Sequence, residues 1–447
     1  MSQYGAIILL LFAAVALSTA APKMKLPYPI LLMIGGIAIG LVPRYANFMI
    51  EPNVVFLLFL PPLLYDASSN IEFREFRANF NTITFLAVSL VLLTMVAIAV
   101  VAHLIVPGLS WPLAFLLGAI LAPPDAVAAI STAKELGLPR QTATILESEG
   151  MMNDATALIA ARFAVAAVAG TAFNFGHALA DFTLALIGGV LVGFGIWTIY
   201  RILMRRFTLT DQAMVSFSLL LPFVAYWLAD AFDLSGVLAV VTLGLMVARN
   251  RDRPRIRKMI EHSQPVLDTA TFLLNGLIFI VLGIIFPHVI KDISNGKILW
   301  LVLCSLAIFL VALVVRFAVI AYYKVRQDNA RFLRQHHHRK VRRSDLLLLR
   351  ASRSMSWKEV VVIGWTGMRG LVSLAVALSL PLTVADDKDF PQRETIIFLT
   401  VTTVIIMLIV QGLGVSPLMR WLKLEEKKPG DKDKKRADRS VRPHNPA

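Results

Sequence analysis

Long apolar segments alternate with short polar loops along almost the whole chain. A helix that crosses a bilayer needs roughly 20 mainly apolar residues. The pattern predicts about thirteen such segments, at residues 4–21, 26–42, 53–68, 81–106, 111–132, 144–170, 178–201, 213–231, 234–248, 264–286, 298–323, 359–382 and 395–421. It therefore predicts an all-α, polytopic membrane protein.

Composition supports this prediction. Of the 447 residues, 57% are hydrophobic and 16% are charged, whereas a soluble domain carries about 25% charged residues. The one cysteine, Cys304, lies in an apolar run, so the sequence predicts no disulfide framework and no CxxC site.

The distribution of positive charge predicts how the chain is oriented. The formal net charge of +15 would fit a nucleic-acid partner, but the basic residues lie in loops between the apolar segments, so we expect none. If the amino terminus lies outside, 36 of the 44 Lys and Arg fall on the cytoplasmic side and five on the outer side. Basic residues favour cytoplasmic loops. We expect the amino terminus outside and the carboxyl terminus inside.

The predicted domain organisation is simple. Residues 1–424 form one transmembrane domain, and residues 425–447 form a basic tail whose charge and prolines are typical of disorder. The longest loop, residues 324–358, contains His336, His337 and His338. Three adjacent histidines can bind metal or respond to pH; the alternative is a solvated basic loop beside anionic lipid.

The fifth segment contains Pro123, Pro124 and Asp125 in succession. Proline removes a backbone donor and blocks the preceding turn, so the pair predicts a broken helix near mid-membrane. The freed backbone groups must be buried in protein or line a hydrated cavity. Asp125 is placed to cap the second half-helix and face a cation. A helix cap with no transport role is the alternative.

The sixth segment carries the strongest candidate site. Asp154 lies ten residues after Thr144, which is about 15 Å along a helix and near the middle of a bilayer core of about 30 Å. Asn153 lies beside it, and Glu149 shares a helical face with Asn153. A carboxylate at this depth costs roughly 2.5–3.5 kcal/mol. We interpret Asp154 as a group that holds either a proton or a small cation.

The twelfth segment places Arg369 between Gly367 and Gly370. Flanking glycines weaken a helix, so this segment is the second predicted discontinuous helix. It runs outward where the fifth runs inward, which predicts inverted repeats at about residues 4–170 and 213–421.

Three further ionisable residues lie in or next to apolar segments. We expect Arg316 of the eleventh segment to pair with Glu149 as a buried structural ion pair. Arg162 is predicted to be a structural charge partner. Asp66, near the end of the third segment, either lines an access funnel or marks the membrane interface.

Four stretches together resemble the monovalent cation:proton antiporters, and in particular the bacterial members of the electroneutral sodium/proton exchanger branch. They are LPPLLYDAS, LAPPDAVAA, ESEGMMNDATAL and GMRGLVSLA. The resemblance covers the second to the thirteenth segment, and the Asn153–Asp154 pair is its most specific part. It implies thirteen spans, crossed broken helices at 123–125 and 367–370, a core domain, a dimerisation domain and a homodimer.

The resemblance also implies roles for single residues. Asp154 carries cation and proton in turn, and Asn153 in place of a second aspartate implies one-for-one exchange. Glu149 and Arg316 match the family's intramembrane ion pair. Many members carry Thr-Asp-Pro at the first break, whereas this chain has Pro124, Asp125 and Ala126. Any ligand supplied by that threonine must come from elsewhere.

The sequence thus predicts a secondary transporter, not an enzyme, that exchanges Na⁺ for H⁺ in a bacterial inner membrane. Asp154 and Asp125 are the expected carboxylate ligands of the cation, supported by Asn153 and Pro124, and no cofactor is expected. Exchange of K⁺ or Li⁺ is left open. The alternative from another class is an intramembrane aspartyl protease, because Tyr65-Asp66 matches one half of such a site, although the sequence lacks the other half, Gly-x-Gly-Asp.

Overall fold

A computed structural model of the chain describes residues 3–24, 28–42, 52–124, 138–169, 175–291, 293, 295–336, 355–367, 371–381, 383 and 389–422. Asp125, Arg369, His337, His338 and the predicted tail lie outside these ranges, as does the side chain of His336.

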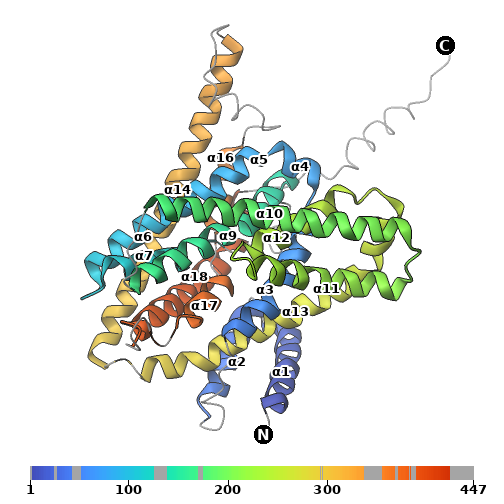
Figure 1. Cartoon of the computed structure of the whole chain (residues 1–447). Helices are drawn as coiled ribbons and strands as arrows, with labels where there is room; N and C mark the ends of the chain where they lie inside the picture. The colour runs from blue at the N-terminus through green and yellow to red at the C-terminus, as the bar shows by residue number, and fades with distance from the viewer. Residues whose placement is uncertain are drawn as a thin grey trace, which may run out of the picture.

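Helices make up nearly all of the described chain (Figure 1). They are α1 (Gln3–Met24), α2 (Tyr28–Gly40), α3 (Pro52–Ser69), α4 (Phe73–Ala78), α5 (Phe80–Thr84), the π-helical turn η2 (Phe85–Leu90), α6 (Val91–Ile105), α7 (Trp111–Leu121), α9 (Arg140–Val168), α10 (Phe175–Arg206), α11 (Asp211–Asp230), α12 (Gly236–Arg249), α13 (Pro254–Lys291), α14 (Asn295–His336), α16 (Trp357–Trp365), α17 (Leu371–Leu378) and α18 (Arg393–Leu422).

The helices confirm the predicted all-α, polytopic class. Each of the thirteen predicted segments coincides with at least one of them. Seven described helices are long and apolar enough to cross a membrane, and four more are apolar but shorter. Among the described residues, the only β pairing is an isolated bridge between Thr383 and Asp389.

Two helices are longer than the apolar pattern predicts. Helix α13 begins at Pro254, ten residues before the expected start, and α14 continues to His336, thirteen residues past the expected end. These extensions are rich in Arg, Lys and Gln, which favour helix as well as water. A hydrophobic pattern marks only the part of a helix that lies in lipid.

Both predicted discontinuous segments are interrupted where the prolines and glycines lie. Helix α7 ends at Leu121, just before Pro123 and Pro124. In the twelfth segment, α16 ends at Trp365 and α17 begins at Leu371. A capping box at Ser356 and Glu359 fixes the start of α16, so this helix is defined at both ends.

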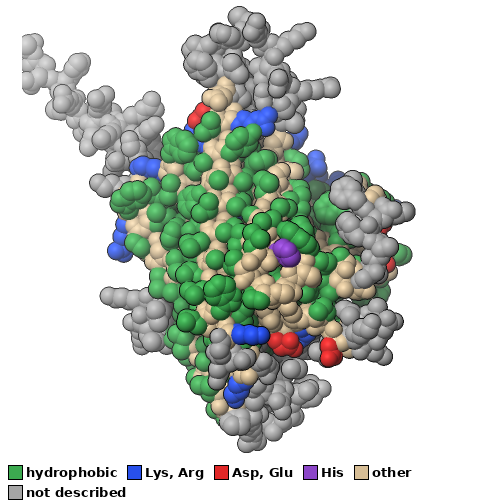
Figure 2. All heavy atoms as spheres, turned by 90° about the vertical axis from the view of Figure 1, so that its left-hand side faces the viewer, with side chains coloured by type: hydrophobic (Ala, Val, Ile, Leu, Met, Phe, Trp, Pro, Cys, Tyr) green, Lys and Arg blue, Asp and Glu red, His purple; other side chains and the backbone are tan. Residues whose placement is uncertain are grey.

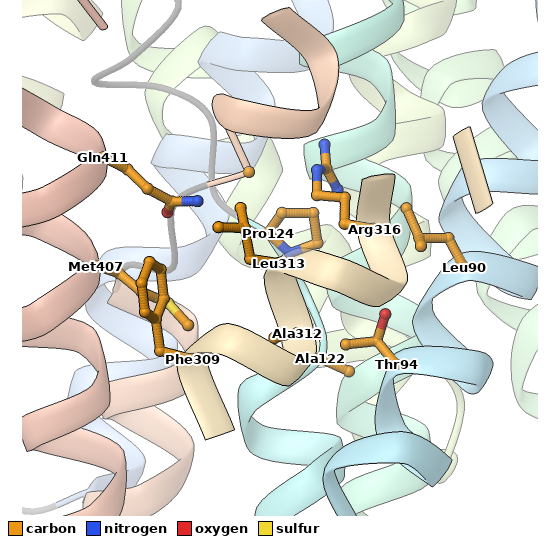
Figure 3. A pocket seen from close by; sticks show the side chains of 11 residues that line it. Leu90, Thr94, Ala122, Pro124, Phe309, Ala312, Leu313, Arg316, Met407 and Gln411 are labelled. Atoms are coloured by element: carbon orange, nitrogen blue, oxygen red, sulfur yellow. The ribbon is translucent and has the colours of Figure 1, made fainter. Parts of the chain in front are cut away.

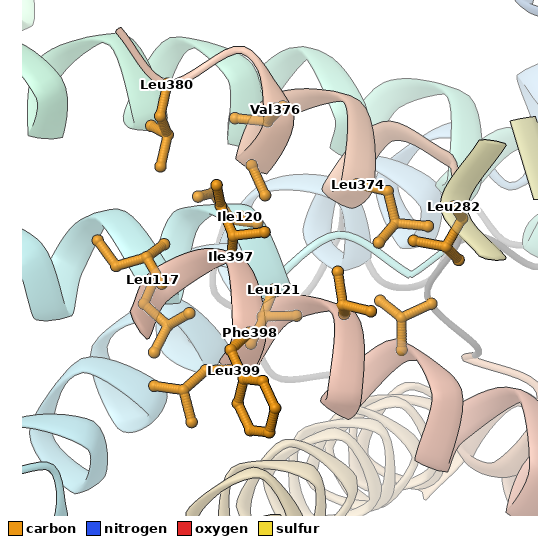
Figure 4. Close-up of a cluster of buried hydrophobic side chains, with 14 of the residues drawn as sticks. Leu117, Ile120, Leu121, Leu282, Leu374, Val376, Leu380, Ile397, Phe398 and Leu399 are labelled. Carbon is orange, nitrogen blue, oxygen red and sulfur yellow. The ribbon is translucent and has the colours of Figure 1, made fainter. Parts of the chain in front are cut away.

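The buried apolar side chains form two large clusters. Figure 4 shows part of the first, in which α7, α13, α17 and α18 pack together. The second gathers side chains of α3, α5, η2, α11 and α12. Helix α9 contributes Met151 and Ala155 to the second cluster and Ala161 and Ala164 to the first. Glu149, Asn153 and Asp154 therefore lie in the part of α9 that packs within the second cluster, before the helix passes to the first.

The outer surface is apolar where a membrane would surround it. Figure 2 shows a broad hydrophobic face with Lys and Arg gathered toward its ends. Large apolar side chains that are exposed include Phe12, Leu104, Leu191, Phe194, Ile199, Leu299 and Val314. Side chains of this kind remain exposed because lipid, not water, is the solvent.

Helices α2 and α13 pack closely through small residues. A Cβ on Gly36 would lie 2.1 Å from the Ile280 carbonyl oxygen, and one on Gly283 would lie 2.2 Å from that of Met33. Glycine at both positions lets the two backbones touch, which is the common way to pack helices in lipid.

Candidate functional site

Helix α9 places the predicted site residues deep inside the protein. Glu149, Asn153 and Asp154 are 1%, 0% and 8% exposed. Residues 149 and 153 are four apart, so their side chains lie on one face of the helix. The same stretch is flanked by members of the second apolar cluster, which provides a surrounding low-dielectric wall.

Glu149 and Arg316 form the ion pair that the sequence predicts. The two terminal nitrogens of the guanidinium donate to the two carboxylate oxygens, at 2.6 and 3.0 Å. The Arg316 Nε donates to the backbone carbonyl of Ile363 at 3.0 Å. One buried guanidinium therefore joins α9, α14 and α16, and the last of these is the first half of a broken helix.

Gly367 makes room for this guanidinium. A Cβ at Gly367 would lie 2.3 Å from Arg316 Nε and 2.6 Å from its Cδ. From the sequence, we interpret Gly367 as a residue that weakens the helix and so favours a break. The structure adds a second reason, because only a residue without a side chain lets the break approach Arg316.

Asn153 ties α9 to the other break. Its Nδ2 donates to the backbone carbonyl of Pro124 at 2.9 Å. An ionised aspartate in the same place has no proton to donate. In the part of the chain that the structure describes, nothing donates to the Asn153 Oδ1, although this atom is buried. That oxygen is available to a ligand.

The two breaks meet at one small cavity, shown in Figure 3. Its volume is about 10 Å³, and Pro124, Gly367 and Arg316 line it. The helix interruptions are thus side by side in space although they are more than 240 residues apart in the sequence. This is the juxtaposition expected of crossed broken helices.

A much larger cavity, about 840 Å³ in volume, lies farther along α9. Leu158, one helical turn beyond Asp154, lines it together with side chains of α10, α17 and the turn between α11 and α12. Its charged lining residues are Arg162, Asp181 and Asp233.

Arg162 also pairs with Asp230 of α11 at 2.8 Å, with the two side chains 60% and 49% exposed. The predicted charge partner is present, and a pair this exposed contributes little stability.

Asp66 has partners of its own. Its carboxylate accepts hydrogen bonds from Asn70 at 2.8 Å and from Gln264 at 2.7 Å. The first partner follows the end of α3 and the second belongs to α13. Asp66 therefore joins the end of α3 to α13.

Two buried polar residues were missed in the sequence. Glu359 accepts from Thr142 at 3.0 Å and so joins α16 to the start of α9. Its signal was present, because Ser356 and Glu359 have the spacing of a capping box. Gln411 of α18 lines the small cavity between the breaks. It occurs within a continuous apolar run, and no local pattern marks it.

Interrupted helices that meet inside a helical bundle, beside ionisable side chains, are typical of secondary transporters. That is the class of protein which this fold and site define. Residues 7–421 match the family described as sodium/hydrogen exchanger, transmembrane, and the chain belongs to this family of transporters.

Individual proteins agree with this assignment. The chain is 32% identical over 431 residues to an uncharacterised Na⁺/H⁺ exchanger of Mycobacterium tuberculosis, covering 94% of this chain and 75% of the relative. It is 32% identical over 423 residues to a sodium, potassium, lithium and rubidium/H⁺ antiporter of Bacillus pumilus, covering 92% of this chain and 60% of that protein. The fold matches the sodium proton antiporter MjNhaP1 of Methanocaldococcus jannaschii with a TM-score of 0.70 at 18% identity, covering 92% of this chain and all of the other.

These findings leave the protease hypothesis without support. Such a site needs two aspartates that act together from neighbouring helices. The hydrogen-bond partners of Asp66 are an asparagine and a glutamine, and the family is one of transporters.

Proposed function

We propose that the protein is a secondary active antiporter that exchanges a monovalent cation, Na⁺ in the first place, for H⁺ by alternating access. The observation that carries this proposal is the buried Asn153–Asp154 pair of α9, joined to the first break by the bond from Asn153 to Pro124. A carboxylate in this setting is suited to hold either ion. Membership of the sodium/hydrogen exchanger family supports the choice of substrates.

The proposed cation ligands are oxygen atoms, which hard cations prefer. Asp154 supplies a carboxylate, and Asn153 supplies its Oδ1, which accepts no hydrogen bond within the described ranges. We assign Asp125, directly after Pro124, as the second carboxylate. Arg369 in the second break, together with Arg316, balances the negative charge of the site. Glu149 forms an ion pair with Arg316 and holds α9 against α14.

The stoichiometry follows from the charge of the pair. Asn153 is neutral, so Asp154 is the one titratable member. A single carboxylate that alternates between a proton and a monovalent cation carries the same charge in both directions. Exchange is therefore one-for-one and electroneutral, and the two ions compete for the site.

The 840 Å³ cavity is the proposed route to the site from one side of the membrane. It reaches Leu158, one turn from Asp154. With the amino terminus outside, α9 runs outward, so this cavity opens to the exterior. Asp181 and Asp233 along its wall favour cations over anions.

Potassium is the second candidate for the cation. The Bacillus pumilus relative is named for sodium, potassium, lithium and rubidium, and a site made of two carboxylates and one amide oxygen does not by itself exclude larger ions. Assays with Na⁺, K⁺ and Li⁺ in parallel distinguish these substrates.

We place the protein in a bacterial inner membrane, as a homodimer with the carboxyl terminus in the cytoplasm, where it serves pH and sodium homeostasis. The transmembrane exchanger domain spans residues 1–424, with inverted repeats at about 4–170 and 213–421, and residues 425–447 form a disordered basic tail. The charge asymmetry of the loops supports the orientation.

Exchange in reconstituted vesicles tests the function. We expect the purified protein to raise the internal pH of vesicles, reported by an internal dye, when a cation gradient is imposed. Asp154→Asn removes the ionisable group at nearly constant shape and should abolish this flux. Asp252→Asn, an exposed carboxylate in the turn before α13, is the matched control and should retain it. Appreciable flux through Asp154→Asn at any pH would contradict the role of Asp154.

A further inference from the structure

The cavity between the two breaks has the dimensions of a water site. Its volume of about 10 Å³ is close to that of one water-sized probe. Ala122 and Pro124 line it from the first break and Gly367 from the second. Arg316 and Gln411 provide polar walls from α14 and α18.

Gln411 is the unexplained member of this lining. It is 2% exposed, and its Oε1 accepts no hydrogen bond from any residue within the described ranges. Figure 3 shows the side chain reaching from α18 toward Pro124. A buried amide oxygen without a donor is unfavourable unless a ligand supplies one. A leucine would fill the same space without that cost.

Other polar side chains of α18 serve as a comparison. The hydroxyls of Thr400, Thr402 and Thr403 are also buried and without a hydrogen-bond partner among the described residues. None of these three threonines lines the cavity, whereas Gln411 does. Gln411 therefore combines a buried amide oxygen that lacks a donor within the described ranges with a place in the wall of a cavity large enough for a donor.

We propose that Gln411 binds a water molecule in this cavity and is a positioning residue for cation and proton binding. The water donates to the Gln411 Oε1 and reaches the freed backbone of the breaks. The cavity is connected to the candidate site, because Pro124, which lines it, accepts the hydrogen bond from Asn153.

The Gln411 amide and its water reduce the positive electrostatic potential of the Arg316 guanidinium. This guanidinium forms part of the cavity wall, so the negative ends of both dipoles turn toward its positive charge. Dipoles in a low-dielectric interior act strongly over short distances. They reduce the repulsion that Arg316 exerts on any positive species at Asp154. Without them, both the cation and the proton should bind more weakly.

The test is the dependence of KM for Na⁺ on pH, measured in proteoliposomes, and it rests on the proposed exchange function. With two competing ions, KM is constant at alkaline pH and rises below a break-point set by the proton affinity of the site. Gln411→Leu should raise the KM for Na⁺ on the alkaline plateau about fivefold, which is the change expected from the loss of one hydrogen bond. The break-point should move to lower pH by about 0.7 unit, because the proton affinity of the site should also fall about fivefold.

Two more variants separate positioning from a merely structural role. Gln411→Glu puts negative charge in the same place, so the plateau should fall below that of the parent and the break-point should move to higher pH. Thr402→Val removes an equally buried hydroxyl of α18 away from the cavity, and both quantities should stay at the parent's values. Thermal unfolding in detergent shows that each variant is folded.

The possible outcomes keep the two proposals apart. If the parent exchanges ions and Gln411→Leu leaves plateau and break-point unchanged, the inference about Gln411 is wrong. It is equally wrong if Gln411→Leu alters only the maximal rate, or if Thr402→Val shifts both quantities as much. If the parent shows no exchange with Na⁺, K⁺ or Li⁺, the proposed function itself fails.

Discussion

Arg316 donates to acceptors on two other helices, the Glu149 carboxylate of α9 and the Ile363 carbonyl of α16. Three of its N–H groups are used in this way. A lysine has a single nitrogen and cannot satisfy a carboxylate and a carbonyl in this planar arrangement. The identity of the residue as arginine is therefore set by geometry as much as by charge.

Removing either partner of this pair should destabilise the protein strongly. Glu149→Gln or Arg316→Met strands the other charge in the interior, which costs about 3–5 kcal/mol. Thermal unfolding in detergent, followed by intrinsic fluorescence, measures the loss. The double swap, Glu149→Arg with Arg316→Glu, should recover only part of it, because a glutamate at 316 cannot donate to Ile363.

The exposed pair of Arg162 and Asp230 is the internal control. Its two side chains are 60% and 49% exposed, so Arg162→Met should leave the unfolding temperature within experimental error. Single variants of Glu149 and Arg316 that melt with the parent would show that the buried pair contributes nothing.

Between elements, the second break approaches α14 closely at Gly367. Gly367→Ala would place a methyl group 2.3 Å from Arg316 Nε. Either the break or the guanidinium must move, and overpacking of this kind costs about 1–3 kcal/mol. We expect lower thermal stability and a lower exchange rate.

A second glycine provides the matched control for this substitution. Gly195 lies within α10, and a Cβ there would meet nothing within 4 Å. Gly195→Ala should be neutral or stabilising by up to about 1 kcal/mol, because alanine favours helix. Equal effects of the two substitutions on unfolding would mean that the contact with Arg316 is not the cause.

The elements were largely predictable because lipid imposes a simple rule on each of them. Apolar runs located all thirteen segments, and proline and glycine located both interruptions. The ends of α13 and α14 were not predictable from hydropathy, since both continue into water as polar helix. Hydrophobicity reports the solvent around a helix and not its length.

The site was predictable to the extent that charge is costly in lipid. Glu149, Asp154 and Arg316 stood out for that reason, and Asn153 stood out as the neighbour of Asp154. The pairing of Glu149 with Arg316 followed from opposite charge. Gln411 carries no charge and its neighbours in the sequence are apolar, so no local pattern reveals it. Its role depends on the residues of other helices that line the same cavity. The second function of Gly367 likewise depends on a residue of another helix.

For the whole molecule, the neutrality of Asn153 makes a prediction about transport. One-for-one exchange moves no net charge, so the rate should not depend on membrane potential, which otherwise contributes about 2.3 kcal/mol per charge per 100 mV. Vesicles clamped with potassium and valinomycin, with Na⁺ or Li⁺ as the test ion, measure this. Raising the cation concentration tenfold should also shift the acidic limb of the pH profile by about one unit, as competition at one site requires.

A steep dependence of the rate on the imposed potential would rule out one-for-one exchange, and with it the role given to Asn153. A pH profile that does not move with cation concentration would rule out a shared site. The two measurements are independent, because an electroneutral exchanger with separate sites would pass the first and not the second.

The pairing of Glu149 with Arg316 also limits how early this part of the protein can fold during its synthesis. The two residues are 167 positions apart, and a ribosome adds about 5–20 residues per second. The carboxylate of the nascent α9 therefore waits roughly 8–33 s before its partner has been made. During that interval it must remain in contact with water at the insertion machinery, since an unpaired charge in lipid is costly. The membrane domain is consequently completed late, when α14 arrives and α9 can settle between the two clusters.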